Sequence, residues 1–341
     1  MFLSGFLIVL VLVLVYLLII IFFPILREPQ VQMKNQEEER VAPENREEIV
    51  YEIGEERVHG WFYLPKERKT TVPCIILSHG FGGTKDALLE RYALRFNEAG
   101  YAALTYDYRH FGTSEGKPRQ LYMASKQEED LRGAVDYARK RKEVDCKKIV
   151  LWGTSASGGY GLVLAAENPT IAGVIAQCPA LDKNIDGRVV LEREGWRFFL
   201  KLFVHAQRDR GRGRLGLSPH YIPIVGRPGE TAMLTAVGAY EGYQDILLNS
   251  PTFQNRVCAQ VLLTGRGENP SDFAVHVHCP TLILACEKDI LVSMEAVEKV
   301  KKSMGDHCRV KTYPIEHFDI YQGENFDNAV QDMLEFIAEI V

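Results

Sequence analysis

Short apolar runs alternate with amphipathic segments along most of this chain. The runs predict buried strands at residues 72–77, 101–106, 149–152, 173–177, 281–286 and 309–313. Apolar positions recur at helical spacing between the first two runs, which predicts a helix over residues 86–99. Further helices are predicted over residues 123–141, 157–167, 293–304 and 325–340. Buried strands that alternate with helices indicate an α/β fold whose mostly parallel sheet is covered on both faces.

Two regions fall outside this alternation at the start of the chain. The first 26 residues carry no charged side chain and are mostly Leu, Ile, Val and Phe, and about 20 such residues span a bilayer as a helix. A secretory signal fits less well, because no basic residue precedes the stretch and no small-x-small motif precedes Arg27. We therefore expect an uncleaved transmembrane anchor over residues 1–26 and a polar tether over 27–48. The folded domain is expected at 49–341, opening with a hairpin of residues 48–53 and 57–63.

Charge and cysteine usage bear on location and partners. The nearest cations, Arg27, Lys34, Arg40 and Arg46, follow the apolar stretch, so the positive-inside rule favours a single-pass protein whose domain lies on the cytoplasmic side. The seven cysteines show no disulfide-type spacing. A net charge of -5 with scattered cations gives no reason to expect nucleic acid. Without a C-x-x-C or H-E-x-x-H motif, no metal site is predicted.

One strand runs into a turn rich in glycine and serine, with the sequence KIVLWGTSASGG over residues 148–159. A strand that turns sharply into a helix strains the residue at the apex, so only small side chains fit two positions before and after it. Gly153 and Ser157 meet this condition around Ser155, which we predict to be a nucleophile. Ser157 also has small neighbours, but the spacing from the apolar run favours Ser155.

Three other loops supply the partners that a serine nucleophile needs. Asp289 follows the strand at 281–286 and His317 follows the strand at 309–313, which is the order nucleophile, acid, histidine. Both are expected at the same edge of the sheet as Ser155. The glycine-rich loop after residue 77 would complete an oxyanion hole, formed by the amides of Phe81 and Ala156.

With these residues in place, the chain from about Glu47 to Val341 resembles the α/β-hydrolase superfamily, in particular its dienelactone hydrolase-like and serine aminopeptidase-like branches. The matching motifs are HGFGG (79–83), YDYRHFGTSEG (106–116), WGTSASGG (152–159), EKD (287–289) and EHFDIY (316–321). Dienelactone hydrolases proper use cysteine as nucleophile, whereas this chain has Ser155. The resemblance implies an α/β-hydrolase fold with an inserted cap, here residues 181–279, and a reaction that needs no cofactor.

The expected cap contains an aromatic stretch and a basic run. The stretch at 196–204 is predicted to be one helix packed on the core of the cap, or alternatively the wall of an acyl-chain pocket. The run at 208–214 is predicted to be a solvated loop, with contact to anionic lipid headgroups as the alternative.

Several polar residues outside the proposed nucleophile, acid and histidine have structural interpretations. An ion-paired turn that braces the serine turn is predicted for Asp107, Arg109 and Ser114. His79 is expected to order the oxyanion loop. In an extended Val275-His276-Val277-His278 segment the two histidines would share one side, but no metal-ligand partner stands at a recognisable spacing.

The sequence thus predicts a membrane-anchored serine hydrolase that cleaves a small, in some cases lipophilic, acyl ester or thioester. Ser155 would attack, His317 would accept and return the proton, and Asp289 would fix the imidazole tautomer. An aminopeptidase-like enzyme is one rival, for which an acidic cap residue such as Glu192, Glu194 or Glu230 would hold the amino group. An inactive hydrolase fold that serves as a tethered binding module is the other. The oligomeric state is not predicted.

Overall fold

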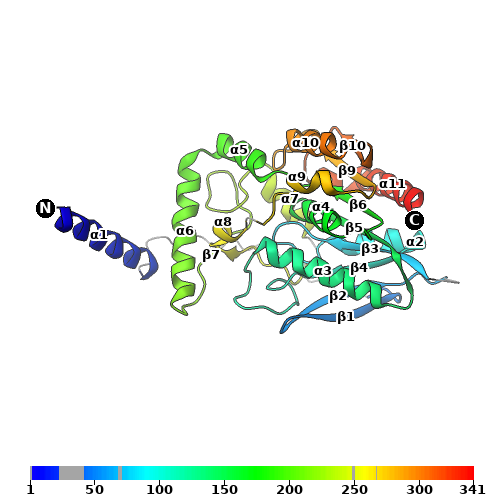
Figure 1. The fold of residues 1–341 in the computed structure, drawn as a ribbon, viewed down its shortest axis with the longest axis horizontal. Coiled ribbons are helices and arrows are strands. Elements are labelled where there is room, and N and C mark those ends of the chain that lie inside the picture. The colour runs from blue at the N-terminus through cyan, green and yellow to red at the C-terminus, as the bar shows by residue number, and fades with distance from the viewer. Residues whose placement is uncertain (1, 23–41, 68–70, 248–249, 266) are drawn as a thin grey trace.

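The computed structural model describes residues 2–22, 42–67, 71–247, 250–265 and 267–341 (Figure 1). Its main sheet has eight strands in the order β1-β2-β4-β3-β5-β6-β9-β10. Their bounds are β1 (Arg46–Ile53), β2 (Glu56–Tyr63), β3 (Val72–Ser78), β4 (Ala102–Tyr106), β5 (Val144–Thr154), β6 (Gly173–Gln177), β9 (Thr281–Cys286) and β10 (Cys308–Tyr313). Strand β2 is antiparallel to β1 and β4, and every other pair is parallel. The predicted hairpin and mostly parallel sheet are confirmed.

Helices cover both faces of this sheet (Figure 1). One face packs on α2 (Leu89–Glu98) and α11 (Gly323–Ile340), the other on α3 (Ala124–Lys140), α4 (Ala156–Glu167) and α10 (Met294–Met304). Strand β5 shows the cause, because Ile149 and Leu151 join the core cluster on one face while Val150 and Trp152 join the other. A strand buried on both faces reads as a continuous apolar run, which is why these strands were recognisable in the sequence.

Several element boundaries differ from the predicted ones, most of all at β5, which begins at Val144 rather than at residue 149. Helix α2 begins at Leu89 rather than at residue 86, because Leu88 has a left-handed backbone with φ of 71° and breaks the helix before it. Strand β1 begins at Arg46, inside the predicted tether, where Arg46 bonds to Glu90 at 2.8 Å. The tether prediction for residues 27–41 lies outside the described residues.

The chain between β6 and β9 consists of helices and two short strands, and we call this segment the cap. It contains α5 (Lys183–Glu194), α6 (Trp196–Arg214), β7 (Tyr221–Ile222), α7 (Ala239–Ile246), β8 (Val257–Cys258), α8 (Val261–Thr264), α9 (Pro270–Phe273) and η1 (Ala274–His276). The residues at 275–278 are therefore not extended as predicted, since a 3-10 turn ends at His276.

The basic run at 208–214 is helical, so the prediction of a solvated loop is wrong. It forms the last two turns of α6, and Arg208 and Asp209 are buried there. The Asp209 carboxylate accepts the backbone N–H groups of His220 at 2.8 Å and Gln260 at 3.0 Å. These long-range bonds hold the run in place, and no local sequence pattern indicates them.

Helix α1 (Phe2–Phe22) lies apart from the sheet and meets the molecule at α6 (Figure 1). Residues 5–22 have a mean hydropathy of 3.4, so the helix is long and apolar enough to cross a membrane. A signal sequence near the N-terminus also satisfies this criterion of length and hydropathy.

Candidate active site

Ser155 stands at the apex of a strained turn between β5 and α4. Its backbone has φ of 54° and ψ of -120°, a region that non-glycine residues rarely occupy. The turn is tight, because a Cβ added at Gly153 would lie 2.4 Å from the carbonyl oxygen of Ser157. The carbonyl of Gln177 accepts the Ser155 N–H at 2.9 Å, and the Ser155 carbonyl accepts that of Ala180 at 2.9 Å. The surrounding strands therefore maintain the strain at this serine.

Ser157, the other candidate for the apex, points into the protein. Its hydroxyl donates to the carbonyl of Ser78 at 2.7 Å and accepts the backbone N–H of Thr154 at 2.9 Å. The side chain is 1% exposed. Its contacts join the end of β3 to the turn, which is a structural role.

Asp289 and His317 come together from two neighbouring loops, after β9 and after β10 respectively. Asp289 Oδ2 lies 2.5 Å from His317 Nδ1, and both side chains are almost fully buried. Asp289 Oδ1 accepts the backbone N–H groups of Leu291 at 2.8 Å and Val292 at 3.1 Å. Two amides thus hold the carboxylate in the orientation that meets the imidazole.

The other nitrogen of His317 faces a cysteine. Cys178 Sγ lies 3.9 Å from His317 Nε2 and 3.3 Å from the Tyr321 hydroxyl. In this structure Nε2 faces this thiol. The Ser155 hydroxyl makes no hydrogen bond with any described residue. Strand β6 ends at Gln177, and Cys178 follows it directly with φ of 35°. Its position just past a strand end, at the edge where Ser155 lies, was the signal in the sequence.

This environment raises the pKa of His317 well above its ordinary value. Burial opposes the charged imidazole, but the sulfur of Cys178 and the carboxylate of Asp289 outweigh that effect. His317 is therefore electrostatically prepared to hold a proton that a nucleophile gives up.

The predicted oxyanion residues flank Ser155. Ala156 is the first residue of α4, and N–H groups in the first turn of a helix have no partner within it. Phe81 lies in the loop after β3, which approaches the turn closely, since a Cβ added at Gly80 would be 3.3 Å from Ser155 Cβ. The Tyr243 hydroxyl donates to the Phe81 carbonyl at 2.7 Å. The His79 ring lies 3.0 Å from the Gly80 carbonyl, in agreement with its predicted ordering role.

The turn after β4 is ion-paired, as predicted, but it braces the oxyanion loop rather than the serine turn. Asp107 accepts both the backbone N–H and the ammonium of Lys85 at 2.7 Å, and both side chains are buried. Burial opposes ionisation of Asp107, yet Lys85 outweighs it, so the pKa of Asp107 lies below its ordinary value. Arg109 instead pairs with Asp130 at 2.5 Å, and the Ser114 hydroxyl donates to the Asp107 carbonyl at 2.6 Å.

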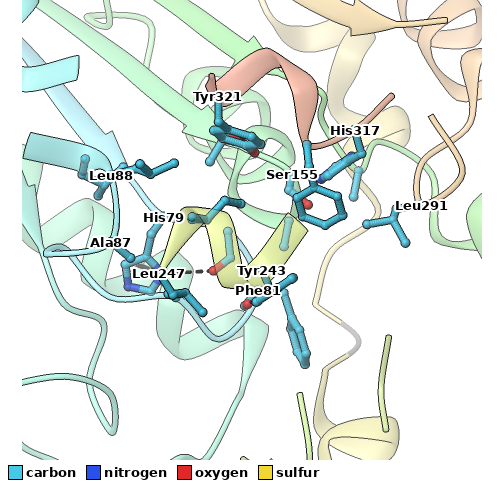
Figure 2. A pocket seen from close by; sticks show the side chains of 18 of the residues that line it. His79, Phe81, Ala87, Leu88, Ser155, Tyr243, Leu247, Leu291, His317 and Tyr321 are labelled. Carbon is cyan, nitrogen blue, oxygen red and sulfur yellow. Dashed lines mark hydrogen bonds between the residues drawn. The ribbon is translucent and has the colours of Figure 1, made fainter. Parts of the chain in front are cut away.

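Ser155 and His317 line a cavity of about 240 Å³ between the sheet edge and the cap (Figure 2). Apolar side chains make up most of its wall, including Ala87, Leu88, Leu89, Leu234, Ile246, Leu247, Leu291 and Val292. Among the described residues that line it there is no carboxylate and no residue of the stretch 196–204. The cap carboxylates have other partners. Glu192 lies 4.0 Å from the Arg188 guanidinium, Glu194 pairs with Arg193 at 2.9 Å, and Glu230 accepts the backbone N–H of Arg227 at 2.8 Å.

Cys178, Asp289 and His317 bring their ligand atoms within 4.8 Å of one another, a spacing at which a metal is conceivable. The carboxylate faces Nδ1, however, while the thiol faces Nε2 on the other side of the ring. One ion cannot bind all three groups unless the ring turns. The arrangement fits a proton relay better than a metal centre.

Comparisons with known proteins bear on the family and the fold. The family described as serine aminopeptidase, S33, matches residues 70–317. The quorum-quenching protein AidA of Acinetobacter baumannii (strain MDR-ZJ06) is 33% identical over 294 residues, which cover 86% of this chain and 95% of the relative. Thiohydrolase apmlB of Arthrinium phaeospermum is 30% identical over 285 residues, 78% of this chain and 89% of the relative. The crystal structure of the α/β hydrolase GrgF from Penicillium sp. sh18 covers 86% of this chain and 98% of its own, with a TM-score of 0.74 and 24% identity.

Proposed function

Because the chain belongs to the serine aminopeptidase S33 family of α/β hydrolases, we propose that it is a serine hydrolase that cleaves small acyl esters or thioesters. One observation carries the proposal: a strained serine shares an apolar cavity with a histidine whose far nitrogen is bonded to a buried aspartate. An inactive binding module would have no need for this combination.

The reaction would proceed through an acyl-enzyme. Ser155 Oγ attacks the carbonyl carbon while His317 Nε2 takes its proton, after rotation of the serine or imidazole brings these atoms together. The amides of Phe81 and Ala156 stabilise the oxyanion. His317 then returns the proton to the leaving alcohol or thiol, and water hydrolyses the acyl-enzyme by the same steps. Asp289 keeps the Nδ1 proton in place and stabilises the imidazolium.

The lining of the cavity favours an acyl group over an amino group. An aminopeptidase must bind a charged amine, yet the described residues that line this cavity include no carboxylate. Each buried CH₂ of an acyl chain contributes about 0.8 kcal/mol, or roughly fourfold in kcat/KM, until the cavity is full. The thiohydrolase relative adds thioesters to the substrates to be tested.

A fluorophosphonate probe tests the nucleophile. We expect Ser155→Ala to abolish labelling and to lower turnover by several powers of ten. The matched Ser157→Ala variant should keep its labelling, while the lost hydrogen bonds lower the free energy of unfolding by about 1–3 kcal/mol. Probe attachment mapped to Ser157 by mass spectrometry would reverse the assignment.

A series of p-nitrophenyl esters of increasing acyl length, with matched thioesters and aminoacyl p-nitroanilides, tests the substrate class. We expect kcat/KM to rise with chain length over the short esters and the anilides to react slowest. Preferential turnover of aminoacyl anilides would favour the aminopeptidase alternative. A folded protein that takes no probe and turns over none of these substrates would favour the binding module.

We further propose that α1 is an uncleaved anchor with the hydrolase domain on the cytoplasmic side. The length and hydropathy of α1 support a membrane-spanning helix, and the cations Arg27 and Lys34 after it support this orientation. The full chain should stay with membranes through alkaline washing and should keep its N-terminal residues when its intact mass is measured. Protease added to intact cells should not reach the domain; digestion would reverse the orientation, and loss of residues 1–26 would identify a signal sequence.

A further inference from the structure

An apolar face of α6 is left uncovered at the outer side of the cap. Trp196, Leu200 and Phe203 are 64%, 52% and 43% exposed, and spacings of four and three residues align them on one side of the helix. Leu215 and Leu217 are exposed just beyond the end of the helix. Exposed apolar side chains gathered on one helix face indicate an interaction surface.

The same helix carries almost exclusively positive charge. Its cations are Arg197, Lys201, Arg208, Arg210, Arg212 and Arg214. Its only acidic residue, Asp209, is buried and bonded to backbone amides, so it does not offset these charges at the surface. Tryptophan, leucine and phenylalanine on a helix rich in arginine and lysine are typical of helices that lie in the headgroup region of a bilayer.

Helix α1 supplies the direction in which a bilayer would lie. Arg208 donates to the carbonyl of Ile20 at 2.5 Å and Arg212 to that of Ile21 at 3.3 Å, so α6 caps the C-terminal end of the apolar helix. Figure 1 shows α1 extending from α6 away from the sheet, with α6 running across its end. If α1 crosses a bilayer, α6 therefore lies along the surface at which α1 emerges.

We propose that the exposed face of α6 docks on the anionic surface of the membrane that α1 anchors. A symmetric dimer through this face would set arginines and lysines against their copies, and like charges oppose such an interface. Anionic headgroups instead attract these cations, and each cation near the surface raises the affinity of the protein for the membrane about fivefold. The proposal is independent of the hydrolase reaction and uses the proposed anchor only for the direction of the bilayer.

A protein that begins at residue 42 separates α6 from the anchor. Among the residues whose burial is described, none of α1 belongs to a cluster of the hydrophobic core, so this shortened protein keeps its core. We expect it to float with phosphatidylcholine vesicles that contain phosphatidylglycerol and to release at high salt. Leu200→Glu should weaken this binding at least tenfold, and the double change Arg210→Ala with Arg214→Ala should weaken it about 25-fold.

The matched control is Val275→Glu, which places the same charge at an exposed apolar position in η1, and it should bind vesicles like the parent. Binding that Leu200→Glu leaves unchanged, or no binding at all, would overturn the proposal. So would a dimer in solution that Leu200→Glu dissociates. All variants should hydrolyse a soluble ester at the parental rate, which keeps this result separate from the proposed reaction.

The full chain in vesicles gives a second, positional test. Of the three tryptophans, Trp196 is exposed, Trp61 is half-buried and Trp152 is buried in the core. Lipids brominated on their acyl chains should quench part of the tryptophan emission of the parent and much less of Trp196→Phe. Equal fractional quenching in the two proteins would contradict docking. Extraction of the full chain by alkali, with vesicle binding of the shortened protein intact, would refute the anchor alone.

Discussion

Replacing Asp289 with asparagine changes one atom that faces the imidazole. The retained Oδ1 can still accept the N–H groups of Leu291 and Val292, so the asparagine amide NH₂ takes the place of Oδ2, 2.5 Å from His317 Nδ1. An NH₂ group donates, which forces the imidazole proton onto Nε2. In that tautomer Nε2 cannot accept the proton of Ser155. We therefore expect Asp289→Asn to disable the base without disturbing the loop.

The expected loss is large because the pair is almost fully buried. Opposite charges about 4 Å apart at an effective dielectric of about 20 attract by about 4 kcal/mol, which is roughly three powers of ten in rate. The unfavourable tautomer adds to this loss, and the corresponding change in Ser-His-Asp proteases lowers kcat about 10⁴-fold. We expect kcat/KM to fall by about 10³ to 10⁴, and the free energy of unfolding to change far less.

The assay pairs ester hydrolysis with thermal unfolding. Asp272→Asn is the control, because that carboxylate is exposed on α9 and lies outside the cavity. It should keep parental turnover and melting temperature. An Asp289→Asn variant within tenfold of the parent at neutral pH would refute the assignment of Asp289 as the partner of the base. A large drop in melting temperature would instead assign the residue a structural role.

Three further outcomes follow from the described contacts. Asp107→Ala leaves the ammonium of Lys85 buried without its carboxylate, so the free energy of unfolding measured in urea should fall by about 3–5 kcal/mol. A change under about 1 kcal/mol would contradict this. Cys178→Ala removes a group that raises the pKa of His317, so the imidazole becomes a neutral base at lower pH and the acidic limb of the kcat/KM profile should shift to lower pH. A shift to higher pH would contradict the cause assigned here. Leu247→Trp narrows the cavity and should cut turnover of long acyl esters more than that of acetate, which the ratio of the two kcat/KM values measures.

The sequence by itself predicted the sheet and the order of the candidate site. Strand β5 is buried on both faces, so it appears as an apolar run, and Gly153 beside Ser155 marks the strained turn within a few residues. Asp289 and His317 each follow a strand that was visible in the same way, and the structure brings their side chains into contact. Periodicity and strand ends are local properties, which a single sequence retains.

Other features depend on contacts between distant segments, and these only the tertiary structure decided. Three such features are the contact of Cys178 with His317, the pairing of Lys85 with Asp107, and the closure of the cavity by cap residues. In each, the residues come from segments far apart in the chain. The basic run is helical because Asp209 is held by amides beyond the helix. A side chain's partners are set by the packing of whole elements rather than by its sequence neighbours, so the pattern along the chain carries no record of them.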